Sequence, residues 1–303
     1  MSPAEVSPAE VSPAEGAPNG DSPAERDSRG PSLGVAFAAS EISVLFRRRR
    51  TWAMLGALAL VPVMIAAAIR LSSSEVSPGR GPAFLDSITQ NGLFVALTAL
   101  TVCIPLFLPL TIGVVAGDTI AGEANLGTLR YLLVTPVARL RLLVVKYLGA
   151  ALFCLAATVV IVLAGVAIGA ALFPIGPVTL LSGDTVDVGG FAVRCLLLAL
   201  YVTVSLLGFS AIGLFISTLT TVPVGAMAAT IVLSAVAQIL DALPQLEAVH
   251  PLLFTHYWLD FGDLLRQPIA WGSFGDNLVL QAAYVAVFGA LAYGRLSTKD
   301  ILS

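Results

Sequence analysis

The chain has 303 residues, of which 57% are hydrophobic and only 12% are charged, and its mean hydropathy is +0.92. Because a soluble domain carries about 25% charged residues, this composition excludes an ordinary water-soluble protein. The formal charge of −3 and the scattered Lys and Arg residues argue against a nucleic-acid partner, which requires a concentrated basic face.

The first 31 residues form a repetitive tail. The sequence Ser-Pro-Ala-Glu begins at Ser2, Ser7, Ser12 and Ser22. Low hydrophobicity with recurring proline cannot bury enough apolar surface to offset the entropy of the chain, so residues 1–31 are predicted to be disordered. They do not resemble a signal peptide, because no apolar core follows a basic start.

Residues 32–50 are predicted to form a helix at the inner membrane surface. Its apolar residues lie on two arcs, one with Leu33, Phe37 and Val44 and the other with Val35, Ile42, Leu45 and Phe46. Because the apolar residues lie on two arcs, the amphipathic character of this helix is weak, which is typical of a surface helix with one arc against protein. The alternative is a simple continuation of the tail. Arg47 to Arg50 directly precede the first apolar run, which indicates a cytoplasmic anchor.

Residues 51–303 predict an all-α, polytopic membrane domain with six transmembrane helices. Its apolar runs are about twenty residues long, the length needed to cross a hydrocarbon core of roughly 30 Å at about 1.5 Å per residue. The predicted spans are residues 52–69, 93–116, 142–172, 192–216, 223–242 and 274–293. The third is long enough to tilt or to project from the bilayer, and its Gly165 and Gly169 permit close approach of another helix.

The distribution of basic residues predicts that both termini are cytoplasmic. Twelve Lys and Arg residues then lie inside, and only Arg70, Arg80, Arg194 and Arg266 lie outside. Cytoplasmic segments carry the excess of Lys and Arg in membrane proteins. The protein is therefore expected in a plasma (inner) membrane.

No residue pattern predicts chemistry by the chain itself. Cys103, Cys154 and Cys195 lie in apolar runs, where cysteine behaves as a small buried hydrophobe, and no cysteine near His250 and His256 completes a zinc set. No lysine follows a glycine as a phosphate-binding loop requires. We expect no catalytic residue, no metal site and no cofactor bound by this chain.

The segment between the second and third spans, residues 117–147, carries the most informative pattern. Asn125 is predicted to cap a short helix that begins at Leu126. Thr135 followed by Pro136 is typical of an N-cap and a first-turn proline, which would start the third span.

The predicted short helix is amphipathic. Leu126, Leu129 and Leu133 recur at i, i+3 and i+7, so they share a face that the groove of a partner protein can accept. The alternative is an ordinary juxtamembrane helix that rests on lipid headgroups.

This segment resembles the cytoplasmic loop of ABC-2-type permeases. That family shows an acidic residue, Gly-Thr-Leu, a leucine pair, Pro-Val, a basic residue and a lysine that enters the next span. The matching residues are Glu123, Gly127-Thr128-Leu129, Leu132-Leu133, Pro136-Val137, Arg139 and Lys146. The six-span plan extends the resemblance over residues 32–303.

The resemblance implies that residues 126–134 are the coupling helix that docks into the ATP-hydrolysing subunit. It also implies a second permease copy or paralogue, ATP and Mg bound by the ATPase subunit, and export of an amphipathic, drug-, peptide- or lipid-like substrate. The implied coupling residues are Glu123, Asn125, Leu126, Gly127, Thr128, Leu129, Arg130, Leu132, Leu133, Pro136 and Arg139. A non-transporting scaffold or sensor and an ion-coupled carrier are the alternatives; the carrier lacks the ionisable residue expected near mid-span.

Two further segments leave alternatives open. The aromatic-rich residues 246–271 on the predicted outer side form either a re-entrant element or a plain interfacial belt. Thr230, Ser234 and Gln238 recur at i, i+4 and i+8, and this polar stripe either lines the translocation path or joins helices by hydrogen bonds.

Overall fold

The computed structural model describes residues 33–72, 91–127, 136–179 and 182–298. Within these ranges six helices are long and apolar enough to cross a membrane: Arg49–Leu71, Phe94–Asn125, Arg139–Leu172, Val188–Leu219, Pro223–Asp241 and Gly272–Thr298. All six predicted spans are therefore found, and the all-α class is confirmed. A short antiparallel pair, β1 (Val178–Thr179) with β2 (Thr185–Val186), is the exception to helical structure.

The second span consists of three helical segments. α4 (Phe94–Val102) continues into the π-helix η1 (Cys103–Phe107) and then into α5 (Leu108–Asn125). Pro105 and Pro109 explain the change, because proline lacks the N–H group that an α-helix interior needs.

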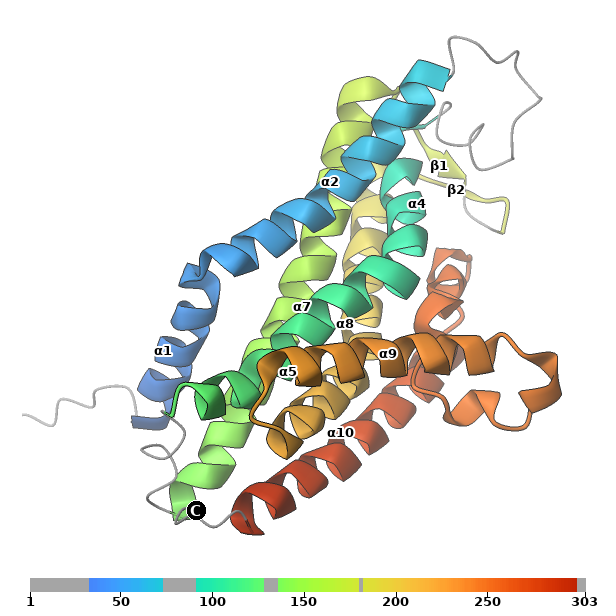
Figure 1. The fold of residues 1–303 in the computed structure, drawn as a ribbon. Coiled ribbons are helices and arrows are strands. Elements are labelled where there is room, and N and C mark those ends of the chain that lie inside the picture. Colours follow the sequence, from blue (N-terminus) through green and yellow to red (C-terminus); the bar gives the residue numbers. More distant parts are fainter. Residues whose placement is uncertain (1–32, 73–90, 128–135, 180–181, 299–303) are drawn as a thin grey trace, which may run out of the picture.

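The helix predicted before the first span is found as α1 (Leu33–Arg47), which lies beside α2 (Arg49–Ser72) and α7 (Pro136–Leu172) (Figure 1); its place at the membrane surface stays a prediction. Leu45 and Phe46 pack against the bundle, whereas Val44 is exposed. One of the two predicted arcs therefore faces protein. The Thr51 hydroxyl and the Trp52 indole N–H donate to the carbonyls of Leu45 and Phe46, which caps the end of α1 as the chain turns into α2.

α8 (Val188–Leu219) is the central helix of the bundle (Figure 1). In the most apolar part of α8, 78% of the residues are buried, against 22% in α9 (Pro223–Asp241) and 17% in α10 (Gly272–Thr298). The outer helices keep apolar side chains exposed because lipid tails are as apolar as the side chains themselves. Most side chains in this part of α8 are therefore surrounded by protein.

The two glycines of the third span allow α7 to lie against α4. A Cβ atom added at Gly169 would lie 2.0 Å from the carbonyl oxygen of Gly92, and one at Gly165 would lie 2.6 Å from the Cα of Ala96. The close approach predicted from these glycines is thus confirmed.

Residues 246–271 contain short 3₁₀ segments that fold against the bundle. These are η2 (Pro244–Leu246), η3 (His250–Leu252) and η4 (His256–Leu265). Phe254, Trp258 and Phe261 are buried, and the Trp258 indole N–H donates to the carbonyl of Ser205 at 2.9 Å, near the middle of α8. The belt alternative, with aromatic rings facing lipid, does not fit these three side chains.

The outer surface of η4 is acidic. Burial raises the pKa of Asp260; nearby His256 opposes the shift, and the carboxylates of Asp263 and Asp241 add to it. His256 Nδ1 lies 2.9 Å from Asp241 Oδ1, which joins η4 to the end of α9.

The glycine contacts generate a matched pair of substitutions. Gly169→Ala should lower the free energy of unfolding by about 1–3 kcal/mol, because the new methyl group overlaps the backbone of Gly92. Gly56 on α2 has open space around it, so Gly56→Ala should raise the free energy of unfolding by about 0.5–1 kcal/mol. Unfolding in detergent measures both values, and equal stabilities of the two variants would contradict the close packing of α4 and α7.

Candidate functional site

The structure corrects the predicted boundaries of the segment 117–147. α5 continues through Gly117 to Asn125, so the interpretation of Asn125 as the cap of a helix that begins at Leu126 is wrong. The N–H groups of Leu126 and Gly127 instead bond back to the carbonyls of Gly122 and Ala124, and Gly127 has a φ of +70°. Gly127 therefore ends α5, since glycine adopts this left-handed conformation at a helix C-terminus without a steric penalty.

The connection between the two spans is consequently short. α7 begins at Pro136, as the first-turn proline predicts, which leaves residues 126–135 between α5 and α7. Thr128, Leu129, Arg130, Leu132 and Leu133 lie outside the described residues. The coupling helix over residues 126–134 therefore stays a prediction.

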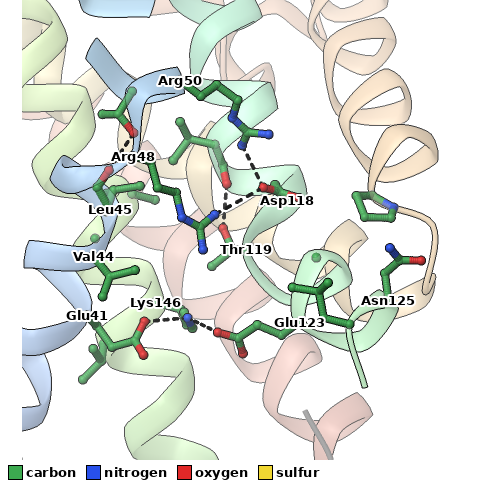
Figure 2. A pocket seen from close by; sticks show the side chains of 18 residues that line it. Glu41, Val44, Leu45, Arg48, Arg50, Asp118, Thr119, Glu123, Asn125 and Lys146 are labelled. Atoms are coloured by element: carbon green, nitrogen blue, oxygen red, sulfur yellow. Dashed lines mark hydrogen bonds and ion pairs between the residues drawn. The ribbon is translucent and has the colours of Figure 1, made fainter. Parts of the chain in front are cut away.

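Lys146 joins three helices near this connection (Figure 2). Its Nζ atom lies 2.6 Å from Glu41 Oε2 on α1 and also pairs with the carboxylate of Glu123 on α5. Only 10% of the Lys146 side chain is exposed. A partly buried ammonium with two carboxylates is screened less than a surface pair, so this contact holds α1, α5 and α7 together.

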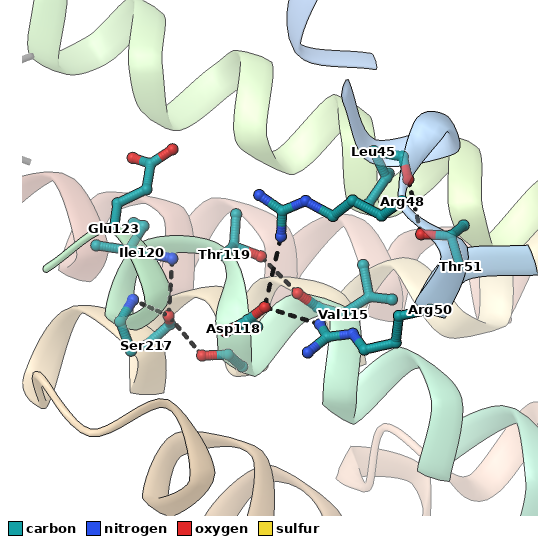
Figure 3. A network of polar contacts seen from close by, with 12 residues as sticks. Leu45, Arg48, Arg50, Thr51, Val115, Asp118, Thr119, Ile120, Glu123 and Ser217 are labelled. Atoms are coloured by element: carbon teal, nitrogen blue, oxygen red, sulfur yellow. Dashed lines mark hydrogen bonds and ion pairs between the residues drawn. The ribbon is translucent and has the colours of Figure 1, made fainter. Parts of the chain in front are cut away.

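Asp118 makes a second ionic contact about one and a half turns away from Glu123 on α5 (Figure 3). Its Oδ2 atom lies 2.7 Å from Arg50 Nη2 and 3.7 Å from Arg48 Nη1. The Arg47 to Arg50 run, interpreted from sequence as an anchor, thus also binds the end of α5. This contact ties the start of α2 to the same turns of α5 that carry Glu123.

A serine on α8 fixes the opposite side of α5 (Figure 3). The Ser217 hydroxyl donates to the carbonyl of Gly117 at 2.7 Å and accepts from the N–H groups of Ile120 and Ala121. The end of α5 is therefore held by α1, α2, α7 and α8.

The ionic contacts of Lys146 and Asp118 border a cavity of about 270 Å³. Glu123, Asn125 and Leu126 line it together with the three basic residues (Figure 2). The Leu126 side chain is 74% exposed, as a residue that is available to a partner must be. Three of the predicted coupling residues therefore meet in one place.

Arg139 lies elsewhere. Its Nη1 atom donates to the carbonyls of Leu296 and Ser297 at 3.2 and 2.9 Å. Those carbonyls belong to the last turn of α10, where an arginine satisfies orphan acceptors and the negative end of the helix dipole. Arg139 thus joins the start of α7 to the end of α10.

Comparison with known protein families agrees with this arrangement. A family model described as ABC-2 family transporter protein matches residues 35–301. The chain belongs to the ABC-2 transporter family. No curated protein matches the chain. The resemblance found from residues 117–147 is confirmed, and this ABC-2 chain is a multi-pass membrane component of a transporter.

The polar stripe on α9 of the ABC-2 chain makes its hydrogen bonds within that helix. The side chains of Thr230, Ser234 and Gln238 all bond to carbonyls of α9 itself, so these bonds do not join helices. Thr230 and Ser234 are buried, and a Cβ atom at Gly213 on α8 would lie 3.0 Å from the Thr230 methyl group. Thr230 thus packs against α8, and a role of the stripe in the translocation path stays a prediction.

Sequence reasoning missed the ionic contacts and a buried amide pair. Asn277 Nδ2 donates to Ser205 Oγ at 2.7 Å, and Gln281 Nε2 donates to the carbonyl of Phe254 at 3.0 Å. Asn277 and Gln281 lie at i, i+4 in an apolar span, a signal that was present and was not used. The pairing of Arg50 with Asp118, 68 residues apart, has no signal in a single sequence.

The Lys146 contact gives a stability prediction. Lys146→Met leaves Glu41 and Glu123 as neighbouring carboxylates without their cation, and should lower the free energy of unfolding by about 1–3 kcal/mol, between the values for surface and fully buried pairs. Lys146→Arg keeps the charge and should recover part of this loss. Thermal unfolding in detergent and protease cleavage of α1 measure the effect.

The control removes an exposed ion pair. Arg266 pairs with Asp263 at 3.3 Å on the surface of η4, and Arg266→Met should change stability by less than about 1 kcal/mol. If Lys146→Met were no more harmful than Arg266→Met, Lys146 would not hold the three helices together.

Proposed function

We propose that this chain is the transmembrane permease subunit of an ATP-driven exporter. A separate ATPase subunit would bind ATP and Mg, and its hydrolysis would drive export of an amphipathic, drug-, peptide- or lipid-like substrate. The observation that carries this proposal is the ion pair between Glu123 and Lys146. Glu123 lies three residues before the connection at residues 126–135, and Lys146 ties this end of α5 to α7.

The ionic contacts supply a way to transmit force from that connection. A partner that displaces residues 126–135 acts on the ends of α5 and α7, which Lys146 holds together and links to Glu41 on α1. Arg50 and Asp118 carry the same displacement to α2. Packed helices joined in this way move as a unit rather than bend, which suits a rocking motion between two states.

The charges of the described spans favour an external energy source over ion coupling. Arg194 is buried near the start of α8, where it donates to the carbonyls of Leu264 and Arg266 and to Gln267 Oε1. Its neighbours identify it as a support for η4 rather than as an ion carrier.

The assembly follows from the same proposal. One six-span bundle is half of an ABC-2-type transmembrane unit, so the chain would pair with a second copy or a paralogue and with two ATPase subunits. The α1 end of the bundle would face the cytoplasm of a cell with the protein in its plasma (inner) membrane. The predicted excess of Lys and Arg at that end supports this orientation.

Truncation of two leucines tests docking. Leu129→Ala with Leu133→Ala should weaken retention of the ATPase subunit at least about tenfold, because a leucine in a partner's groove contributes about 25 cal/mol per Å² of buried apolar area. A pull-down and an ATPase assay measure this effect. Leu60→Ala with Met64→Ala removes two exposed apolar side chains of α2 and serves as the matched control.

The docking experiment separates the alternatives. If the Leu129/Leu133 variant retains and stimulates the ATPase like the wild type, residues 126–134 are a lipid-facing connector. If no ATPase is retained by the wild type either, the scaffold or sensor alternative replaces the exporter.

Cysteine labelling tests the orientation. Cysteines at Ser77 and Ser182 should react with an impermeant reagent in intact cells, and a cysteine at Ser297 should react only after permeabilisation. The native Cys103, Cys154 and Cys195 are buried and provide a low background. Labelling of Ser297→Cys in intact cells would reverse the orientation.

A further inference from the structure

An apolar groove of about 710 Å³ lies between α2, α4 and η4. Its described lining contains no charged residue; the lining residues are Ile65, Ala68, Ile69, Phe94, Leu97, Thr98, Thr101, Val102, Leu259, Phe261, Gly262 and Leu265. The floor is well buried, since Leu97, Phe261 and Leu265 are each less than 10% exposed. The groove is thus a defined apolar space and not a shallow feature of one helix.

The groove has the length of one leaflet. Its α4 wall runs from Phe94 to Val102, which is about 12 Å at about 1.5 Å per residue and close to half of a hydrocarbon core of roughly 30 Å. Phe94 begins α4 at the end of the bundle opposite α1 (Figure 1). The groove therefore runs from that end toward the middle of the membrane.

The mouth of the groove is apolar. Leu259 and Val102 are 49% and 40% exposed, and they flank the opening between two transmembrane spans and η4. Exposed apolar side chains at this position suit contact with hydrocarbon. The Thr101 hydroxyl donates to the carbonyl of Leu97 at 3.1 Å, so this donor is satisfied within α4.

We propose that this groove binds one acyl chain of a membrane phospholipid from the leaflet opposite α1. An apolar groove left empty would lose the dispersion contacts of its lining atoms, and water does not enter such a space. A flexible hydrocarbon chain follows walls made by two helices and a 3₁₀ segment. A partner helix instead packs by its ridges against a regular helical face.

The bound chain gives the first two spans and η4 a shared ligand. α2 and α4 belong to the first and second spans, and η4 carries the aromatic residues that pack on α8. An acyl chain in the groove contacts all three elements. Its entry or release therefore responds to any movement of η4 relative to α2. This inference goes beyond the proposed ATP-driven export, because it concerns occupancy by lipid and requires no ATPase subunit.

Photo-crosslinking tests the proposal with the full-length chain. The protein is reconstituted into vesicles of phosphatidylethanolamine and phosphatidylglycerol that contain a phospholipid with a diazirine on its acyl chain. Crosslinked peptides are then quantified by mass spectrometry. After partial delipidation in detergent, we expect at least about ten times more crosslinks at residues 97–102 and 259–265 than on the exposed face of α10.

A matched pair of variants locates the site. Ala68→Phe places a ring in the groove and should reduce the crosslinks at residues 97–102 and 259–265 at least about tenfold. Ala57→Phe makes the same substitution on the exposed face of α2, eleven residues away and therefore about three turns along the same face. It should leave these crosslinks unchanged.

Three outcomes would overturn the proposal. The first is crosslinking of the groove no stronger than that of the α10 face, and the second is equal crosslinking in Ala68→Phe and Ala57→Phe. The third is a crosslink between two copies of the chain through a cysteine at Leu259, which would make the groove a protein interface. Competition by excess unlabelled phospholipid on the wild type gives the same decision if Ala68→Phe does not fold.

Discussion

The fold depends on one constraint: in hydrocarbon, every backbone N–H and C=O group must find a partner within the protein. Six long helices meet this requirement by themselves. Residues 246–271 do not, because 3₁₀ segments leave many carbonyls without a partner in their own chain segment. They can fold into the bundle only where other helices supply donors.

Side chains from α8 and α10 supply those donors. Arg194 and Tyr201 on α8 donate to the carbonyls of Leu264 and Tyr257. On α10, Gln281 and Tyr284 donate to the carbonyls of Phe254 and Leu252. The buried polar residues of these apolar helices thus stabilise the fold of residues 246–271. They satisfy carbonyls of the irregular segment and hold it against the bundle, where η4 forms one wall of the groove beside α2 and α4.

A feature could be predicted from the sequence when it depends on residues that are close together in the chain, and not when it depends on distant ones. The six spans were predictable because length and apolarity are properties of contiguous residues, and Gly165 with Gly169 signalled a close helix contact. The end of the second span was predicted too early, at residue 116, because Asp118 and Glu123 lie in the helix that continues to Asn125. Each acid remains in a helix since a basic residue from another helix reaches it.

Residues 246–271, at the other end of the bundle, also show how contacts between distant residues limit prediction from sequence. Its aromatic composition was visible, but the choice between a belt and a folded-in segment depended on Arg194 and Gln281. Arg194 lies 70 residues from its acceptor Leu264, and Gln281 lies 27 residues from Phe254. A single sequence carries no signal for such pairs. Buried polar residues at helical spacing, as in Asn277 and Gln281, indicate only that some partner exists.

The two ends of the bundle differ in how readily their contacts can change. At the end opposite α1, the hydrogen bonds that hold residues 246–271 are surrounded by apolar side chains. Breaking one of them would leave an unsatisfied buried group, at a cost of about 1–3 kcal/mol. At the α1 end, Arg48 and Arg50 are about half exposed and contact Asp118, so water can replace a lost partner and these ion pairs contribute less. The Lys146 side chain is only 10% exposed and is held more firmly. The contacts of Arg48 and Arg50 with Asp118 are therefore the ones that exchange most readily, whereas the Lys146 contact and the hydrogen bonds at the end opposite α1 keep their helices together.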